Sequence, residues 1–184
     1  MDWTTFAFHM GSIGAGYLFA VAMEWGVHNV LFHRMGKKKG SLFGFHYNDH
    51  HRAVRKTKGG DHAFSGSRFA WNGYGREFWG IIAAAIVTFP VVFVAPLFWV
   101  SAMVCGVHYH VVHTRSHRDI AWCKTHLRWH WDHHMGTNPD VNWGVTNQWF
   151  DQLMGTREVW FSKKERAARA AQAEGLEAAS AAAK

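Results

Sequence analysis

The sequence predicts an all-α integral membrane protein, with about three transmembrane helices and a histidine-rich helical cap on the cytoplasmic side. Two long runs without a charged residue, at 3–23 and 78–113, predict the transmembrane helices. Fifteen histidines in a chain of 184 residues, nearly all of them after Met23, predict the cap. Since the chain is 48% hydrophobic and 16% aromatic, its composition excludes a disordered protein, and its length leaves no room for a second large domain.

The first expected helix covers residues 3–23. This run is long enough to cross a bilayer once, because a spanning helix needs about 20 apolar residues. It contains Gly11, Gly14 and Gly16, and small residues of this kind let two membrane helices approach each other closely. The run lacks a basic N-terminal region and a cleavage site, so we do not expect it to be a removed signal peptide.

The second and third expected helices form a tight hairpin over residues 78–113. The run is too long for one buried core helix and just long enough for two crossings, and Pro90 and Pro96 frame the reversal. The alternative is a soluble protein with an unusually apolar hairpin, because the mean hydropathy of the whole chain is only −0.19.

The distribution of charge predicts the orientation. Residues 1–33 carry a net charge of −2, residues 34–77 carry +7, residues 78–113 carry none, and residues 114–184 carry +2. Three crossings place the two basic segments on the same side of the membrane. Because Lys and Arg concentrate in cytoplasmic segments, we expect that side, and any site built there, to be cytoplasmic.

The chain is expected to divide into a membrane domain over residues 1–161 and a tail over residues 162–184. The tail is rich in Ala, Lys, Arg and Glu, which is typical of a solvated helix or a frayed end, and we expect no chemistry there. The cysteines Cys105 and Cys123 have no CxxC spacing, so they predict neither a disulfide framework nor a cysteine-based zinc module.

The formal net charge of +7 does not indicate nucleic-acid binding. The run Lys37-Lys38-Lys39 is typical of a juxtamembrane segment that faces anionic lipid headgroups. No helix-turn-helix, zinc finger or aromatic RNA-binding platform accompanies the charge. We therefore expect lipid headgroups or an acidic protein, and no nucleic acid, as the partner of the basic residues.

Most of the histidines fall into four clusters at the cytoplasmic ends of the expected spans. They are His28 and His33; His46, His50 and His51; His108, His110 and His113; and His126, His130, His133 and His134. Neutral imidazoles need hydrogen-bond partners when buried, and so many of them at one membrane face are best organised by a cation. A histidine-rich set with few carboxylates suits iron or zinc, whereas magnesium and calcium prefer oxygen ligands.

The spacings within the clusters differ in what they require of the backbone. Histidines four apart share one face of an α-helix and can present two imidazoles to one metal. Three pairs have this spacing: His46 with His50, His126 with His130, and His130 with His134. His28 and His33 are five apart, and so are His108 and His113. Such pairs lie about 140° apart around an ideal helix, so they converge only at a helix end or in a π-bulge.

Several residues outside these pairs also need an assignment. His9, His62 and His117 lie apart from the clusters, and we expect them to be ordinary interfacial or exposed histidines. Glu24 precedes His28 by one helical turn, so it can accept the second ring N–H of His28 and fix its tautomer. An interfacial carboxylate in water is the alternative for Glu24.

These residues resemble the membrane fatty acid hydroxylase/sterol desaturase superfamily. The resemblance covers residues 24–156 in order: EWGVHNVLFH, HYNDHH, HYHVVHTR, HWDHH and NWGVTNQWFDQLMGT. It implies a centre of two iron ions, with ligands at His28, His33, His46, His50, His51, His130, His133 and His134. For the third histidine pair, the segment is similar to the HX4H of carotenoid ring hydroxylases, which selects His108 and His113. The fatty acid hydroxylase branch has HX3H there, a spacing that His113 and His117 match. Whether His110, His117 and His126 are ligands stays open.

The resemblance also implies the activity. We expect an O2-dependent di-iron monooxygenase that hydroxylates an unactivated C–H bond of a lipid taken from the bilayer, with a fatty-acyl chain as first choice. Carotenoid ring hydroxylation is the runner-up, and desaturation or sterol oxidation remain open. No haem or flavin motif is visible, so two electrons must come from a separate ferredoxin- or cytochrome-type donor. A membrane zinc-binding protein without redox turnover is the alternative from another class.

Overall fold

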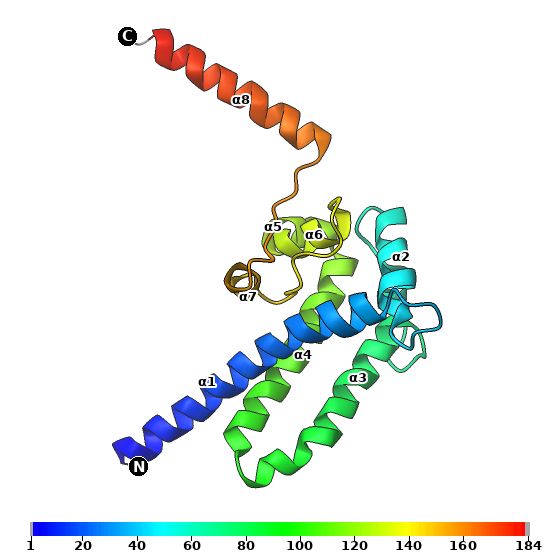
Figure 1. The fold of residues 1–184 in the computed structure, drawn as a ribbon, viewed down its shortest axis with the longest axis vertical. Helices are drawn as coiled ribbons and strands as arrows, with labels where there is room; N and C mark the ends of the chain where they lie inside the picture. Colours follow the sequence, from blue (N-terminus) through cyan, green and yellow to red (C-terminus); the bar gives the residue numbers. More distant parts are fainter. Residues whose placement is uncertain (1, 183–184) are drawn as a thin grey trace.

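The computed structural model describes residues 2–182, which form helices, turns and loops and contain no strand. Three long helices, α1 (Trp3–Gly26), α3 (Gly73–Thr88) and α4 (Pro96–Arg118), lead from the N-terminus and the hairpin bend towards a cap of short helices (Figure 1). The shorter elements are η1 (Val27–Met35), η2 (Phe45–His50), α2 (His51–Lys56), η3 (His62–Ser65), η4 (Phe89–Phe93), α5 (Ile120–His126), α6 (Arg128–Met135) and α7 (Trp149–Leu153). The prediction of an all-α fold is confirmed.

Two helical stretches are long and apolar enough to cross a membrane: Trp3–Met35 and Gly73–Phe93. Their apolar side chains are largely exposed, including Phe8 at 67%, Ile86 at 69% and Phe93 at 78%. A soluble protein would bury such side chains, so this exposure favours contact with lipid. The chain therefore has the character of a membrane protein.

The predicted hairpin is present, and its arms extend beyond the run without charge. Asn72 begins α3 by accepting a hydrogen bond from the backbone N–H of Gly75 at 2.9 Å. The 3-10 turn η4 makes the reversal, and Pro96 begins α4, where its missing N–H has no helical partner to lose. The second arm, α4, is long enough to span, but histidines and arginines in its last turns lower its hydropathy, so α4 is not one of the two candidate spans.

The N-terminal helix packs against α4. A Cβ atom on Gly16 would collide with the carbonyl oxygen of Phe98, so the two backbones meet closely at this glycine. The hydroxyl of Ser101 donates a hydrogen bond to the carbonyl of Ile13 at 2.9 Å across the same contact. Among the three glycines predicted to let helices approach, Gly16 thus lies in the contact.

The cap surrounds a polar centre, and its apolar core is small. Cys123 in α5, Trp131 in α6 and Leu127 between the two helices form the buried core cluster. Beyond them the tail forms α8 (Lys163–Ala182), which points away from the cap (Figure 1). Glu165 at the start of α8 pairs with Arg128 at 2.8 Å.

Candidate metal centre

Ten histidines converge in the cap, and none of them is more than 4% exposed. They come from η1, η2, α2, α4 and α6: His28, His33, His46, His50, His51, His113, His117, His130, His133 and His134. Two stretches of π-helix, η1 and η2, contribute four of the ten. The i→i+5 hydrogen bonding of a π-helix places residues five apart on one face, which joins His28 to His33 in η1. This is the π-bulge that the five-residue spacing required.

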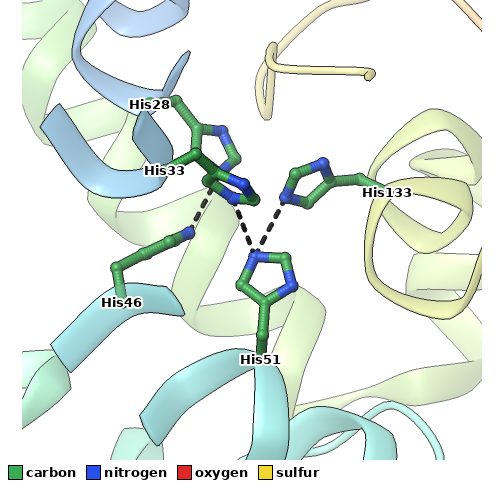
Figure 2. A group of neighbouring side chains, drawn as sticks. All are labelled: His28, His33, His46, His51 and His133. Carbon is green, nitrogen blue, oxygen red and sulfur yellow. Dashed lines mark hydrogen bonds between the residues drawn. The ribbon is translucent and has the colours of Figure 1, made fainter. Parts of the chain in front are cut away.

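The histidines form two adjacent groups. The first histidine group consists of His28, His33, His46, His51 and His133, whose ligand atoms lie within 4.8 Å of one another (Figure 2). The second histidine group consists of His50, His113, His117 and His134, also within 4.8 Å. The Nε2 atom of His130 lies 3.1 Å from the Nε2 of His117, so His130 borders the second group.

Each HH dipeptide supplies one histidine to each group. His51 and His133 belong to the first group, while their sequence neighbours His50 and His134 belong to the second. Consecutive residues of an α-helix point about 100° apart, which lets an HH dipeptide supply one histidine to each of two neighbouring groups. The two groups are therefore neighbours held by the same helices.

Carbonyl and carboxylate oxygens fix the tautomers of several of these histidines. The Nδ1–H of His28 donates to the Trp143 carbonyl at 2.6 Å, and that of His133 donates to the Val141 carbonyl at 2.7 Å. The Nδ1–H of His50 donates to the Asp61 carboxylate at 2.7 Å. Because a neutral imidazole carries one N–H, the Nε2 of each of these rings is left with a lone pair that faces the centre.

The second group supplies the clearest test of whether a metal fits. The Nδ1–H of His113 donates to the Glu77 carboxylate at 2.8 Å, and that of His117 donates to the Gly59 carbonyl at 3.2 Å. Their Nε2 atoms lie 3.1 Å apart, and both carry lone pairs. Two lone pairs cannot form a hydrogen bond, whereas a cation between them would satisfy both. The site thus fits a metal ion that accepts neutral nitrogen ligands.

The electrostatics of the cap agree with this fit. Burial, and to a smaller extent neighbouring imidazoles, lower the pKa of five cap histidines well below the ordinary value: His46, His51, His130, His133 and His134. A lowered pKa keeps the imidazole neutral at physiological pH, and the neutral ring is the form that binds a metal. The centre is therefore ready to accept cations without first losing protons.

Glu24 has a different role from the one predicted. Its carboxylate accepts hydrogen bonds from the backbone N–H groups of Val145 and Thr146 and from the Thr146 hydroxyl. The second ring N–H of His28 goes instead to the Trp143 carbonyl, in the same loop. Glu24 thus anchors the loop that orients His28, and it does not itself accept from that ring.

The prediction that His108 is a ligand is also corrected. His108 is exposed on α4, whereas His117, which we expected to lie apart, is buried in the second group. The cause is the helix: α4 stays α-helical through this region, so residues five apart face different ways and the i,i+4 pair His113 and His117 shares one face. His126 is exposed, and His110 is buried beside Tyr74, with which it stacks at 5.0 Å, outside both groups.

The sequence reasoning missed three buried carboxylates around the centre: Asp61, Glu77 and Asp151. Glu77 precedes the run without charge by one residue, so the criterion that selected Glu24, an ionisable residue at the end of a span, could have found it. Asp61 lies in a loop with no pattern around it, whereas Asp151 lies in the segment NWGVTNQWFDQLMGT, which the resemblance included without a role for this carboxylate.

The structure has two cavities of different character, one beside a histidine of the centre and one on α4. The cap cavity, of about 420 Å3, has His51 and two arginines in its wall; its lining is Tyr47, Asn48, His51, Arg52, Arg55, Thr137 and Pro139. The second cavity is an apolar groove of about 270 Å3 along α4, lined by Trp99, Val100, Met103, Val104 and Val107. One opening thus lies beside the basic segment and the other among apolar side chains.

Comparison with known proteins gives one match. The family model described as fatty acid hydroxylase matches residues 13–156, which include all ten buried histidines of the cap. No curated protein and no solved structure matches the chain.

Proposed function

Because the chain belongs to the fatty acid hydroxylase family, we propose that it is an integral-membrane di-iron oxygenase that hydroxylates an unactivated C–H bond of a lipid. The observation that carries the proposal is the pair of adjacent histidine groups with lone pairs facing one another. The reaction consumes one O2, two electrons and two protons. It converts a C–H bond to C–OH and releases one water.

Two iron ions are the cofactor that we assign to the two groups. Bound iron would supply the reductive activation of O2, which zinc cannot supply because it has no redox chemistry. The residues of the chain hold neutral imidazoles in place, orient them through the Trp143, Val141 and Gly59 carbonyls, and exclude water from the centre. The donor set suits zinc equally well, so a membrane zinc-binding protein is the second candidate.

The spacing of the third histidine pair supports the fatty-acyl branch. The resemblance to carotenoid ring hydroxylases depended on His108 and His113, and His108 is exposed. The pair that shares a group, His113 and His117, has the HX3H spacing of the fatty acid hydroxylase branch. We therefore propose a fatty-acyl chain as the substrate, with ring hydroxylation, desaturation and sterol oxidation as the alternatives.

The apolar surface supports delivery of this substrate from the bilayer. The groove on α4 precedes His113 along the same helix, so an acyl chain in the groove would lead towards the second histidine group. An apolar substrate that moves from lipid into such a groove stays in an apolar environment, so the transfer carries no cost of exposure to water. We propose that the crossing of α4 together with α1 and α3 places this path in the hydrocarbon layer and the cap on the cytoplasmic face.

We propose that an acidic ferredoxin- or cytochrome-type donor docks at the cap cavity. Arg52 and Arg55 line it beside His51, so complementary charge would bring the donor close to one histidine of the first group. Neutralising both arginines should weaken the apparent affinity for the donor several-fold, and so should added salt. The matched control neutralises Lys56 and Lys58, which are exposed in the same basic segment and lie outside the cavity lining. Equal effects of the two variants would contradict docking at the cap cavity and would favour a general role of the basic segment at the membrane surface.

The activity itself is tested by product analysis. Purified protein in lipid vesicles, with a reductant, a donor and ¹⁸O2, should yield a lipid product that is one oxygen heavier and carries ¹⁸O. Boiled protein and an anaerobic sample are the controls. Product that carries no ¹⁸O, or product equal in the controls, would refute an oxygenase.

A further inference from the structure

Glu77 occupies an unusual position between the two histidine groups. Its Oε2 accepts the hydrogen bond of His113, in the second group, at 2.8 Å. Its Oε1 lies 3.5 Å from the Nδ1 of His46, in the first group. The second distance is longer than a good hydrogen bond but short for an electrostatic contact. One carboxylate thus reaches both groups.

The environment of Glu77 does not explain why a carboxylate is buried there. Glu77 is 4% exposed. Within residues 2–182, the ion-pair contacts of Glu77 are with His46 and His113 alone, and no Lys or Arg pairs with it. Removing an ionised carboxylate from water is costly unless positive charge compensates it. Neutral imidazoles supply hydrogen bonds but no such charge, whereas cations bound by the two groups would.

We propose that Glu77 is the shared counter-charge and positioning residue of both metal ions. It orients His113 through a direct hydrogen bond, and its negative charge lies beside a ligand of each ion. Loss of Glu77 should therefore weaken both ions together. This inference rests on the proposed two-metal function and adds to it the link between the two sites.

Asp61 offers a matched control. It is also a buried carboxylate, and it accepts a hydrogen bond from His50 at 2.7 Å, much as Glu77 does from His113. His50 belongs to the second group only. Loss of Asp61 should therefore weaken one ion and leave the other nearly unchanged.

The test is a Co²⁺ titration of the metal-free full-length protein in detergent, followed by the visible absorption of bound Co²⁺. Wild type should bind two ions. In Glu77→Gln the amide oxygen can still accept from His113 but carries no charge, and both ions should bind at least about tenfold more weakly. In Asp61→Asn only one ion should weaken. Wild-type affinity for both ions in Glu77→Gln, or a loss confined to one ion as in Asp61→Asn, would overturn the shared role.

Two further results distinguish a counter-charge from a role of side-chain shape, and a failure of this proposal from a failure of the two-metal function. Glu77→Asp keeps the charge on a shorter side chain, so its affinities should fall between those of wild type and Glu77→Gln. Equal losses in the Asp and Gln variants would contradict a counter-charge. A wild-type chain that binds fewer than two ions would refute the two-metal function and this proposal together, whereas two ions with unchanged binding in Glu77→Gln would refute the role of Glu77 alone.

Discussion

Replacing Asp151 by Ala should destabilise the chain and loosen one wall of the metal centre. The Asp151 carboxylate is fully buried and accepts hydrogen bonds from the backbone N–H groups of Trp143 and Gly144, at 2.9 and 2.8 Å, and from the Thr156 hydroxyl at 2.6 Å. The Trp143 carbonyl in turn accepts the ring N–H of His28. The position of that histidine thus depends on the loop that Asp151 holds.

The size of the destabilisation follows from the hydrogen-bond donors that lose their acceptor. The Ala variant deprives two buried backbone N–H groups of their acceptor, and each unsatisfied group costs about 1–3 kcal/mol. The expected loss in the free energy of unfolding is therefore about 2–6 kcal/mol. For chains of this length each kcal/mol shifts the thermal midpoint by about 2–4 °C, so the midpoint should fall by at least about 4 °C.

The assay is thermal unfolding of the metal-free protein in detergent, followed by tryptophan fluorescence. Glu174→Ala, at an exposed position on α8, is the control and should leave the midpoint unchanged. The Asp151→Ala variant should also bind less metal. A midpoint within 1 °C of wild type, with full metal binding, would show that the loop does not depend on Asp151.

Three further predictions address the ligands, the protonation state and the topology. His134→Ala should abolish oxidation and leave the protein inserted, while His108→Ala should be nearly silent because that side chain is exposed; a silent His134→Ala would contradict the assignment. Burial lowers the pKa of His46, His133 and His134 below the ordinary value of about 6.5, so below that pH the unfolded chain binds more protons at these residues than the folded metal-free protein does. The thermal midpoint should therefore fall as the pH drops from 7 to 5.5, and a midpoint that stays level or rises would refute the lowered pKa. Reporter fusions after Lys58 and after Lys163 should lie on the same, cytoplasmic side, and opposite sides would separate the segments that build the centre.

The parts of the fold that the sequence predicted depend on local patterns. The apolar runs located α1 and the hairpin, because the length of an apolar run is readable residue by residue. The five-residue spacing of His28 and His33 required a helix end or π-bulge, and η1 is a π-helix. The same spacing at His108 and His113 misled the assignment, because α4 keeps regular α-helical geometry there.

The parts that the sequence could not predict depend on long-range contacts. Glu24 contacts a loop at residues 145–146, more than a hundred residues later, and no local pattern connects the two. Asp61 meets His50 only because the chain turns back after α2. The division of the ten histidines into two groups likewise depends on how α2, α4 and α6 meet, which spacing within any one cluster cannot give.

The metal content of the purified protein tests the central claim most directly. Protein purified under anaerobic conditions, without added metal, should contain two iron ions per chain by elemental analysis, and His134→Ala purified in parallel should contain fewer. One or two zinc ions and no iron in the wild-type protein would contradict the oxygenase and favour a zinc-binding membrane protein.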